Sequence, residues 1–295
     1  MATFDASKLN LPFMKFRKIA IGASAILVLA SLVLLSVKGL NYSVDFTGGV
    51  SLQLEFTEPV NISGIRETMN EAGQGQAVIQ ALDDDKNIMI RYQKASDDIR
   101  RQIMTSLEEK HGAVTIQKTD DVGPVVGGEL RRQAFIAVLA AIAFILIYMA
   151  FRFQFRFGVV AVLSLAHDAM LMLGIYSLTG REISTSFIAA ILTVIGYSLN
   201  DSIVVLDRIR ENWGQIRSKG ILDLVNTSIN QTLSRTINTS LTTLLPVLAM
   251  FFFGGEVISN LAFAFLIGIV VGTYSSIYVA SALLAEWSFR RPLKK

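Results

Sequence analysis

Residues 183–212, ISTSFIAAILTVIGYSLNDSIVVLDRIREN, decide the fold of this chain. The stretch begins as an apolar run of the length that a membrane-spanning helix requires, about 20 residues. It carries Asn200 and Asp201 inside that run and ends in the charged sequence DRIRE. An aspartate near the centre of a membrane helix costs about 2.5 to 3.5 kcal/mol on insertion scales, so this carboxylate indicates a functional site.

The composition of the whole chain predicts an integral membrane protein. Of its 295 residues 52% are hydrophobic and only 17% are charged, whereas an average soluble chain has about 25% charged residues. The net charge of +3 is too small to indicate a nucleic-acid partner, and the lack of cysteine excludes disulfides and thiolate sites. The sequence has no nucleotide-binding loop, run of metal ligands or nucleophile–base set, so we expect no covalent enzyme, metal or other cofactor.

Six apolar stretches predict an α-helical protein with six transmembrane helices: residues 19–37, 134–151, 158–178, 183–205, 236–253 and 257–284. The first stretch has two interpretations, a cleaved signal peptide or an uncleaved anchor. Its apolar run is longer than that of a signal peptide, and the following KGLNY offers no clear small-residue cleavage site, which favours the anchor.

Basic residues predict the orientation, because they gather on the cytoplasmic side of membrane proteins. On one side of the predicted spans lie Lys8, Lys15, Arg17, Lys18, Arg152, Arg156, Arg208, Arg210, Arg217, Lys219, Arg290, Arg291, Lys294 and Lys295. The segment 38–129 on the other side holds nine Lys and Arg against fifteen Asp and Glu; Arg131 and Arg132 are a local exception. We therefore expect cytoplasmic termini, residues 1–18 and 290–295, and an external first loop.

The external segment, residues 38–130, predicts a small α+β domain of ferredoxin-like βαββαβ order. Strands are predicted at 50–56, 77–82, 87–92 and 114–118 from alternating apolar residues, with an acidic turn at 83–86. One helix is predicted from residue 59 to about 69, and a second, capped by Ser96, ends at His111. Residues 131–289 form the remaining five-helix transmembrane part.

Arg235 is the predicted partner of Asp201. Asp201 lies about seven residues, or ~10 Å, to the cytoplasmic side of the middle of its span. The next span runs in the opposite direction, so Arg235 near its start has a similar depth. A nearby cation favours the ionised carboxylate and removal from water favours the neutral acid, so this pair suits proton exchange. The alternatives are a static ion pair between two helices and an Arg235 side chain that reaches lipid phosphate.

Other polar residues lie at or near membrane depth. Asn200 is a candidate for a hydrogen bond between helices or for the proton pathway. His167 and Asp168 fall near the middle of the third span and are either a second proton relay or a polar contact with another helix. Asp207, with Arg208 and Arg210 beside it, predicts a surface ion pair. The sequence GIVVG, residues 268–272, predicts close helix packing.

Several motifs resemble the SecF family. The sequence DFTGG, formed by Asp45, Phe46, Thr47, Gly48 and Gly49, is similar to the signature that follows the first span in that family. GYSLNDSIVVLDRIRE at 196–211, RTINTSLTTLL at 235–245, FFFGGE at 251–256 and GIVVGTYSS at 268–276 are similar to its later motifs, in the same order. The resemblance covers nearly the whole chain.

The resemblance implies a function that composition does not. SecF pairs with SecD, and together they resemble the resistance-nodulation-division transporters. The pair assists the Sec translocon channel, SecYEG, at the outer side of the bacterial inner membrane and couples inward proton flow to late steps of preprotein export and release. The family's proton-pathway residues in this subunit match Asp201 and Arg235, and SecD supplies a further aspartate. The DFTGG stretch is implied to be structural.

Two alternatives remain from the sequence. One is a small-molecule efflux transporter of the same superfamily, although the external segment is short and only one six-span half is present. The other is a passive scaffold of the export machinery, whose buried charges only hold helices together. In the proton-driven hypothesis, residues 40–43 and 124–130 are linkers that relay motion, with Gly123, Gly127 and Gly128 as hinges.

Overall fold

The computed structural model describes residues 11–82, 86–93 and 97–290. It divides into two compact units, Met1–Asn41 with Ala137–Lys295, and Tyr42–Ile136. The predicted acidic turn at 83–85, the Ser96 cap and the terminal residues Lys8, Arg291, Lys294 and Lys295 lie outside the described residues.

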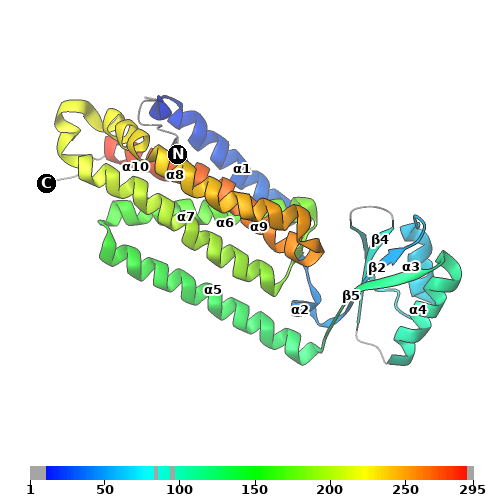
Figure 1. Cartoon of the computed structure of the whole chain (residues 1–295). Coiled ribbons are helices and arrows are strands. Elements are labelled where there is room, and N and C mark those ends of the chain that lie inside the picture. Colours follow the sequence, from blue (N-terminus) through cyan, green and yellow to red (C-terminus); the bar gives the residue numbers. More distant parts are fainter. Residues whose placement is uncertain (1–10, 83–85, 94–96, 291–295) are drawn as a thin grey trace. The chain divides into compact units, whose positions relative to one another are not determined.

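The first unit is a bundle of long helices, coloured blue and green to red in Figure 1. Its elements are η2 (Phe13–Phe16), α1 (Arg17–Val37), the two-residue strand β6 (Glu182–Ile183), α6 (Phe155–Thr179), α7 (Thr185–Glu211), η3 (Asn212–Gln215), α8 (Ile216–Phe253), α9 (Gly255–Tyr274), the π-helical turn η4 (Ser275–Ala280) and α10 (Ser281–Arg290). The greater part of α5 (Pro124–Arg152) also belongs to this unit.

Within the described residues, five stretches of helix are long and apolar enough to cross a membrane: Phe13–Val37, Val125–Arg152, Phe155–Thr179, Thr185–Phe253 and Ile258–Phe289. The fourth is 69 residues long and contains both α7 and α8. In the most apolar windows of α1 and α5 only 17% and 6% of residues are buried, against 44–50% in the other three. The helices α6 to α10 therefore form the interior of the bundle, and α1 and α5 lie at its edge.

Two predicted spans lie within longer helices. The helix that contains the span expected at 236–253 begins twenty residues earlier, at Ile216, and is broken near its start by Gly220, whose φ of 77° is left-handed. The residues at the start of this helix are too polar to form an apolar run, so the sequence pattern did not indicate them. The last predicted span, 257–284, continues through η4 and α10 to Arg290.

Glycines of α9 set its distance from α7. A Cβ at Gly268 would overlap the Val194 side chain, and one at Gly272 would lie 3.0 Å from Ser198. The predicted packing role of the GIVVG motif is confirmed, because any larger residue at Gly268 would force the two helices apart. This close contact brings Ser198 of α7 against the start of η4.

The segment before α1 is held against α8. The Leu11 N–H donates to Asn230 Oδ1 at 2.8 Å, and the Asn230 amide donates back to the Leu11 carbonyl at 2.9 Å. The Met14 N–H donates to Asn226 Oδ1 at 3.2 Å. Two asparagines one turn apart on α8 thus satisfy backbone groups that precede the first helix.

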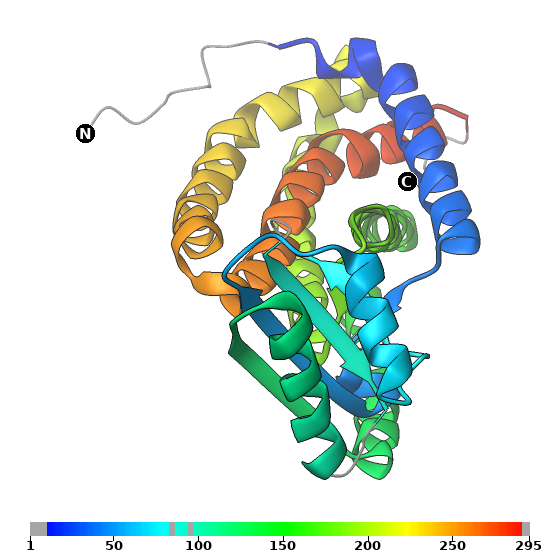
Figure 2. The ribbon, with the colours of Figure 1, turned by 90° about the vertical axis from the view of Figure 1, so that its right-hand side faces the viewer.

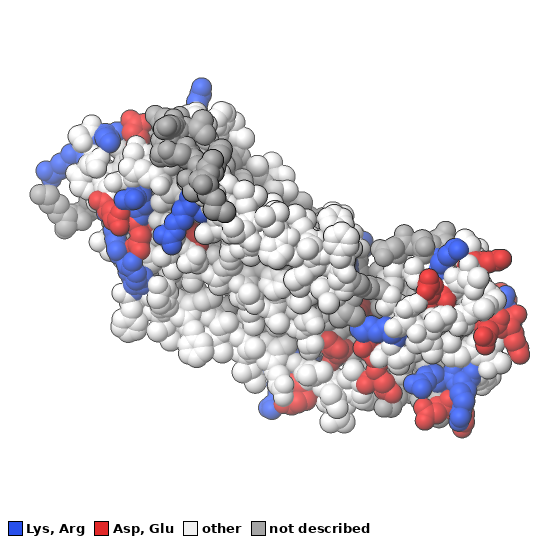
Figure 3. Space-filling view, in the orientation of Figure 1, with Lys and Arg blue, Asp and Glu red and all other residues white. Residues whose placement is uncertain are grey.

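Many charged residues of the helical unit lie at one end, and most of the face in Figure 3 between its two ends is uncharged. At that end Asp207 forms ion pairs with Arg152 and, at 3.0 Å, with Arg210. The predicted ion-pair role of Asp207 is confirmed, and it joins the end of α5 to the end of α7. The Arg152 partner was not predicted.

The second unit contains a four-stranded antiparallel sheet of order β3-β4-β2-β5. Its elements are α2 (Val44–Thr47), β2 (Gly49–Phe56), α3 (Ile62–Glu71), β3 (Val78–Ala81), β4 (Asn87–Tyr92), α4 (Asp97–His111) and β5 (Val114–Val122), preceded by the short β1 (Asn41–Tyr42). Both α3 and α4 lie on one face of the sheet (Figure 2). Alternate residues of β2, Leu52, Leu54 and Phe56, are buried in the core with Ile65 and Ile103.

The DFTGG sequence forms a tight connection into this sheet. Ser43 caps α2 by accepting a hydrogen bond from the Asp45 N–H, and Gly48 and Gly49 follow with φ of 71° and 118°. A Cβ at Gly49 would lie 2.5 Å from the Tyr92 carbonyl oxygen. Both the positive φ and the close approach of β4 therefore require glycine.

The expected linker at 124–130 is not a linker. Residues from Pro124 onward are α-helical, so Gly127 and Gly128 lie inside α5. A Cβ at Gly127 would lie 3.0 Å from the Gly48 backbone nitrogen. Gly127 thus allows the start of α5 to pack against the DFTGG turn, which is a structural role; that these glycines act as hinges stays a prediction.

Candidate functional site

Asp201 lies on the buried side of α7. The helix begins at Thr185, where the Ser184 hydroxyl accepts a hydrogen bond from the Phe187 N–H, and it continues without a break to Glu211. Asp201 is 2% exposed, and its Oδ2 atom has no hydrogen-bond partner among the described residues. Such a group is costly in its ionised form, because a buried carboxylate requires donors or a cation.

Arg235 lies on the neighbouring helix α8 and is exposed. Its charge interacts with Asp201, but no salt bridge within 4.0 Å joins the two side chains in the described part of the chain. The predicted pair is thus near but not in direct contact. An aspartate in this position can lose or gain a proton without first breaking a bidentate ion pair.

Asn200 points away from the bundle. It is exposed, whereas the next residue, Asp201, is buried, as expected from the rotation of about 100° between successive residues of a helix. The structure therefore does not bring Asn200 and Asp201 together on one face. Asn200 and Arg235 both present polar groups on the outside of the bundle.

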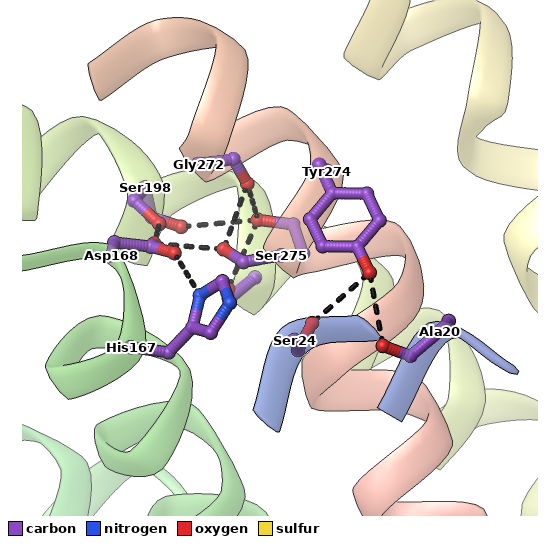
Figure 4. A network of polar contacts seen from close by, with 10 residues as sticks. Ala20, Ser24, His167, Asp168, Ser198, Gly272, Tyr274 and Ser275 are labelled. Carbon is purple, nitrogen blue, oxygen red and sulfur yellow. Dashed lines mark hydrogen bonds and ion pairs between the residues drawn. The ribbon is translucent and has the colours of Figure 1, made fainter. Parts of the chain in front are cut away.

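His167 and Asp168 form a second polar site, in the interior of the bundle (Figure 4). Asp168 is fully buried; its Oδ2 accepts hydrogen bonds from the hydroxyls of Ser198 on α7 at 2.5 Å and Ser275 on η4 at 2.7 Å. Its Oδ1 lies 3.0 Å from His167 Nδ1. Asp168 thus connects three segments of the bundle, α6, α7 and η4.

The serines around Asp168 were missed in the sequence. The Ser276 hydroxyl lies 3.1 Å from that of Ser202 and 3.4 Å from the Ser198 carbonyl oxygen, so it continues the network along α7. The sequence does contain a signal for this network. Ser198 and Ser202 are four residues apart on either side of Asp201, and a second pair of serines, Ser275 and Ser276, follows Gly272. The π-helical turn that starts at Ser275 is of the kind often found at functional sites.

In the described residues no group of three or more His, Cys, Asp and Glu is arranged to hold a metal ion. The polar groups of the two sites are the carboxyls of Asp168 and Asp201, the imidazole of His167, the guanidinium of Arg235 and the neighbouring serine hydroxyls. The carboxyls and the imidazole can bind and release protons, the hydroxyls can share them through hydrogen bonds, and the guanidinium stays positively charged.

Comparison with known proteins gives the class of this chain. The family model "Protein export membrane protein SecD/SecF, C-terminal" matches residues 102–290, and the model "SecD/SecF GG Motif" matches residues 33–60. The chain belongs to the SecD/SecF family of protein export membrane proteins.

Within that family its relatives include SecF subunits, which confirms the resemblance drawn from the motifs. Protein translocase subunit SecF of Desulfurispirillum indicum is 47% identical, over 94% of this chain and 91% of the relative. SecF of Haemophilus influenzae is 43% identical, over 95% and 86%. The crystal structure of SecDF from Thermus thermophilus matches with a TM-score of 0.88 and 44% identity, over 96% of this chain. This chain spans 39% of that SecDF chain.

Proposed function

We propose that this chain is an accessory subunit of the Sec translocon that, together with SecD, uses the proton gradient to assist protein translocation and release across the bacterial inner membrane. The observation that supports it best is the state of Asp201, which is buried in α7 with an unpartnered oxygen and separated from the charge of Arg235. The proton-pathway residues in this proposal are Asp201, Arg235 and Asn200.

The proposed step is a change in charge at Asp201. When Asp201 is protonated it is neutral and its attraction to Arg235 falls, so α7 and α8 can shift; deprotonation restores the attraction. The membrane potential supplies about 2.3 kcal/mol per charge per 100 mV. That is enough to bias an element with two states that differ by a few kcal/mol. The work would be done on preproteins that emerge from SecYEG at the outer face.

The exposed polar residues of α7 and α8 favour a protein partner. Asn200 and Arg235 are exposed within or beside the apolar zone, where lipid cannot satisfy their hydrogen bonds. The relative from Thermus thermophilus is named SecDF and is a single chain. This chain aligns with 37% of the length of that SecDF chain. We infer that a separate SecD covers this face and supplies the rest of the proton path.

We expect the chain to co-purify with SecD in mild detergent. Substitution of both Asn200 and Arg235 by leucine should reduce the recovered SecD, because the polar contacts with the partner are lost. Phe16→Leu is the control, since Phe16 is an exposed apolar residue of η2, and it should leave recovery unchanged. Full stimulation of export by this chain in vesicles without SecD would contradict the proposal.

We also infer six membrane passes, with α7 and α8 as separate passes, and a ferredoxin-like domain outside the cytoplasm. A reporter inserted at residues 218–220 should be accessible only from the cytoplasm, and one inserted at 83–85 only from the outside. Protease protection in sealed cells and inverted vesicles measures both. A cytoplasmic reporter at 83–85 would reverse the orientation and leave the external domain on the wrong side for its proposed work.

A further inference from the structure

The hydroxyl of Ser275 has two hydrogen-bond acceptors and only one hydrogen. It lies 2.7 Å from Asp168 Oδ2 and 3.1 Å from the Gly272 carbonyl oxygen. Because a serine hydroxyl can donate one hydrogen bond and accept others, it can turn from one acceptor to the other. The hydrogen-bond partners of Asp168 therefore suit two protonation states.

In the ionised state every donor points to the carboxylate. Ser198 and Ser275 both donate to Oδ2, and the Nδ1–H of a neutral His167 donates to Oδ1. These three hydrogen bonds stabilise the buried carboxylate in its ionised form, because hydrogen bonds to a charged group are stronger than those between neutral groups. Each of these three groups thus has an acceptor for its hydrogen.

In the protonated state the same groups are again satisfied. A proton on Oδ2 of Asp168 can be donated to the Ser275 oxygen, and the Ser275 hydrogen then turns to the Gly272 carbonyl oxygen. Ser198 and His167 keep their bonds to the carboxyl group. The exchange needs only the rotation of one hydroxyl and no movement of a helix.

The imidazole of His167 is hydrogen-bonded on only one of its two nitrogen atoms among the described residues. Its Nε2 atom is buried without a hydrogen-bond partner in the described part of the chain, and the residue is 7% exposed. A proton there would create a buried N–H without an acceptor, which is costly. The carboxyl of Asp168 is thus the place where an added proton is accommodated.

No lysine or arginine in the described part of the chain forms an ion pair with Asp168. Within the described residues the only ion pair of Asp168 is with His167. The ring of Tyr274 of α9 packs against His167, and its hydroxyl is hydrogen-bonded to Ser24 of α1 at 3.0 Å. On α7 the titratable residues near Ser198 are Tyr197, directly before it, and Asp201, one turn beyond it.

We propose that His167 and Asp168 form a second proton-binding site in the bundle, separate from Asp201. In this site the Ser275 hydroxyl donates to Asp168 when the carboxylate is ionised and turns to the Gly272 carbonyl oxygen when it is protonated. The ligand is a proton. The site goes beyond the proposed function and does not rest on it, because a proton can bind here whether or not export uses it. The serine network that runs from Ser198 through Ser276 to Ser202 joins this site to the turn that carries Asp201.

Infrared difference spectroscopy tests the proposal directly. The full chain is reconstituted into lipid vesicles in the Asp201→Asn background, and spectra are taken as the pH is lowered. We expect a carbonyl band of a buried protonated carboxyl group, which is lost when Asp168→Asn is added and is kept in His167→Gln. A band that survives Asp168→Asn, or a titration that disappears with His167→Gln alone, would overturn the proposal.

Two serine variants keep the test decisive if Asp168→Asn does not fold. Ser275→Ala removes one hydroxyl donor from the ionised carboxylate, so the midpoint of the band should move to higher pH by about one unit. Ser164→Ala is the matched control, because Ser164 is a fully buried serine of α6 whose hydroxyl has no hydrogen-bond partner in the described residues; its midpoint should not move. Equal midpoints for Ser275→Ala and Ser164→Ala would refute the proposed role of the rotating hydroxyl.

Discussion

Asp201→Asn is expected to abolish the part of protein export that depends on the proton gradient, while the chain still inserts and assembles. Asparagine has nearly the shape of a protonated aspartate and cannot ionise, so the change in attraction to Arg235 no longer occurs. Export by vesicles or cells is measured before and after collapse of the gradient, together with membrane insertion and recovery of SecD. The expected result is equal export in both conditions.

Asp207→Asn is the matched control for this experiment. It removes a carboxylate from the same helix, but one that is held by Arg152 and Arg210 at the end of the bundle. Its export should still fall when the gradient is collapsed. If Asp201→Asn also keeps a gradient-dependent component of normal size, Asp201 is not on the proton path and the scaffold hypothesis becomes the better one.

Gly49→Ala is expected to destabilise the α+β domain, Tyr42–Ile136, by at least ~2 kcal/mol. The φ of 118° at Gly49 strains any residue with a Cβ, at a cost of about 1 to 3 kcal/mol. The added Cβ would also lie 2.5 Å from the Tyr92 carbonyl oxygen, so β2 and β4 must move apart. Hydrogen exchange of the full chain should show faster exchange of backbone amides in β2 and β4.

Gly128→Ala provides the comparison. Gly128 lies in the helix α5, and a Cβ added there would have no neighbouring atom within 4 Å. Alanine is a better helix former than glycine by about 1 kcal/mol, so this variant should exchange no faster than the natural chain. Equal exchange in Gly49→Ala and Gly128→Ala would show that the DFTGG turn tolerates side chains.

The helices were predictable from apolar runs except where a helix leaves the apolar zone. The first half of α8 was missed because its residues are polar on average. Its buried residues Ile221, Leu224, Val225 and Ile229 nevertheless follow the i, i+3, i+4 spacing of an amphipathic helix. That periodicity, and not the length of an apolar run, was the signal that could have placed the start of α8.

The candidate site was predictable only in part from the sequence. The spacing from the span boundaries predicts a similar level for Asp201 and Arg235, and in the structure they lie on the adjacent helices α7 and α8. The orientation of Asn200 and the contacts of Asp168 depend on how each helix is rotated in the bundle. Serines give little help, because in a helix they also bond their own i−4 carbonyl, as Ser276 does with Gly272.

The hydrogen bonds between Leu11 and Asn230 set an order of events during biosynthesis. The two residues are 219 positions apart, and a ribosome adds about 5 to 20 residues per second, so roughly 10 to 45 s pass between their synthesis. For that time the backbone groups of Leu11 have no Asn230 to bind, although α1 is already complete. The nascent chain can therefore close this contact only after α7 and the first part of α8 have left the ribosome, which makes it a late step of assembly.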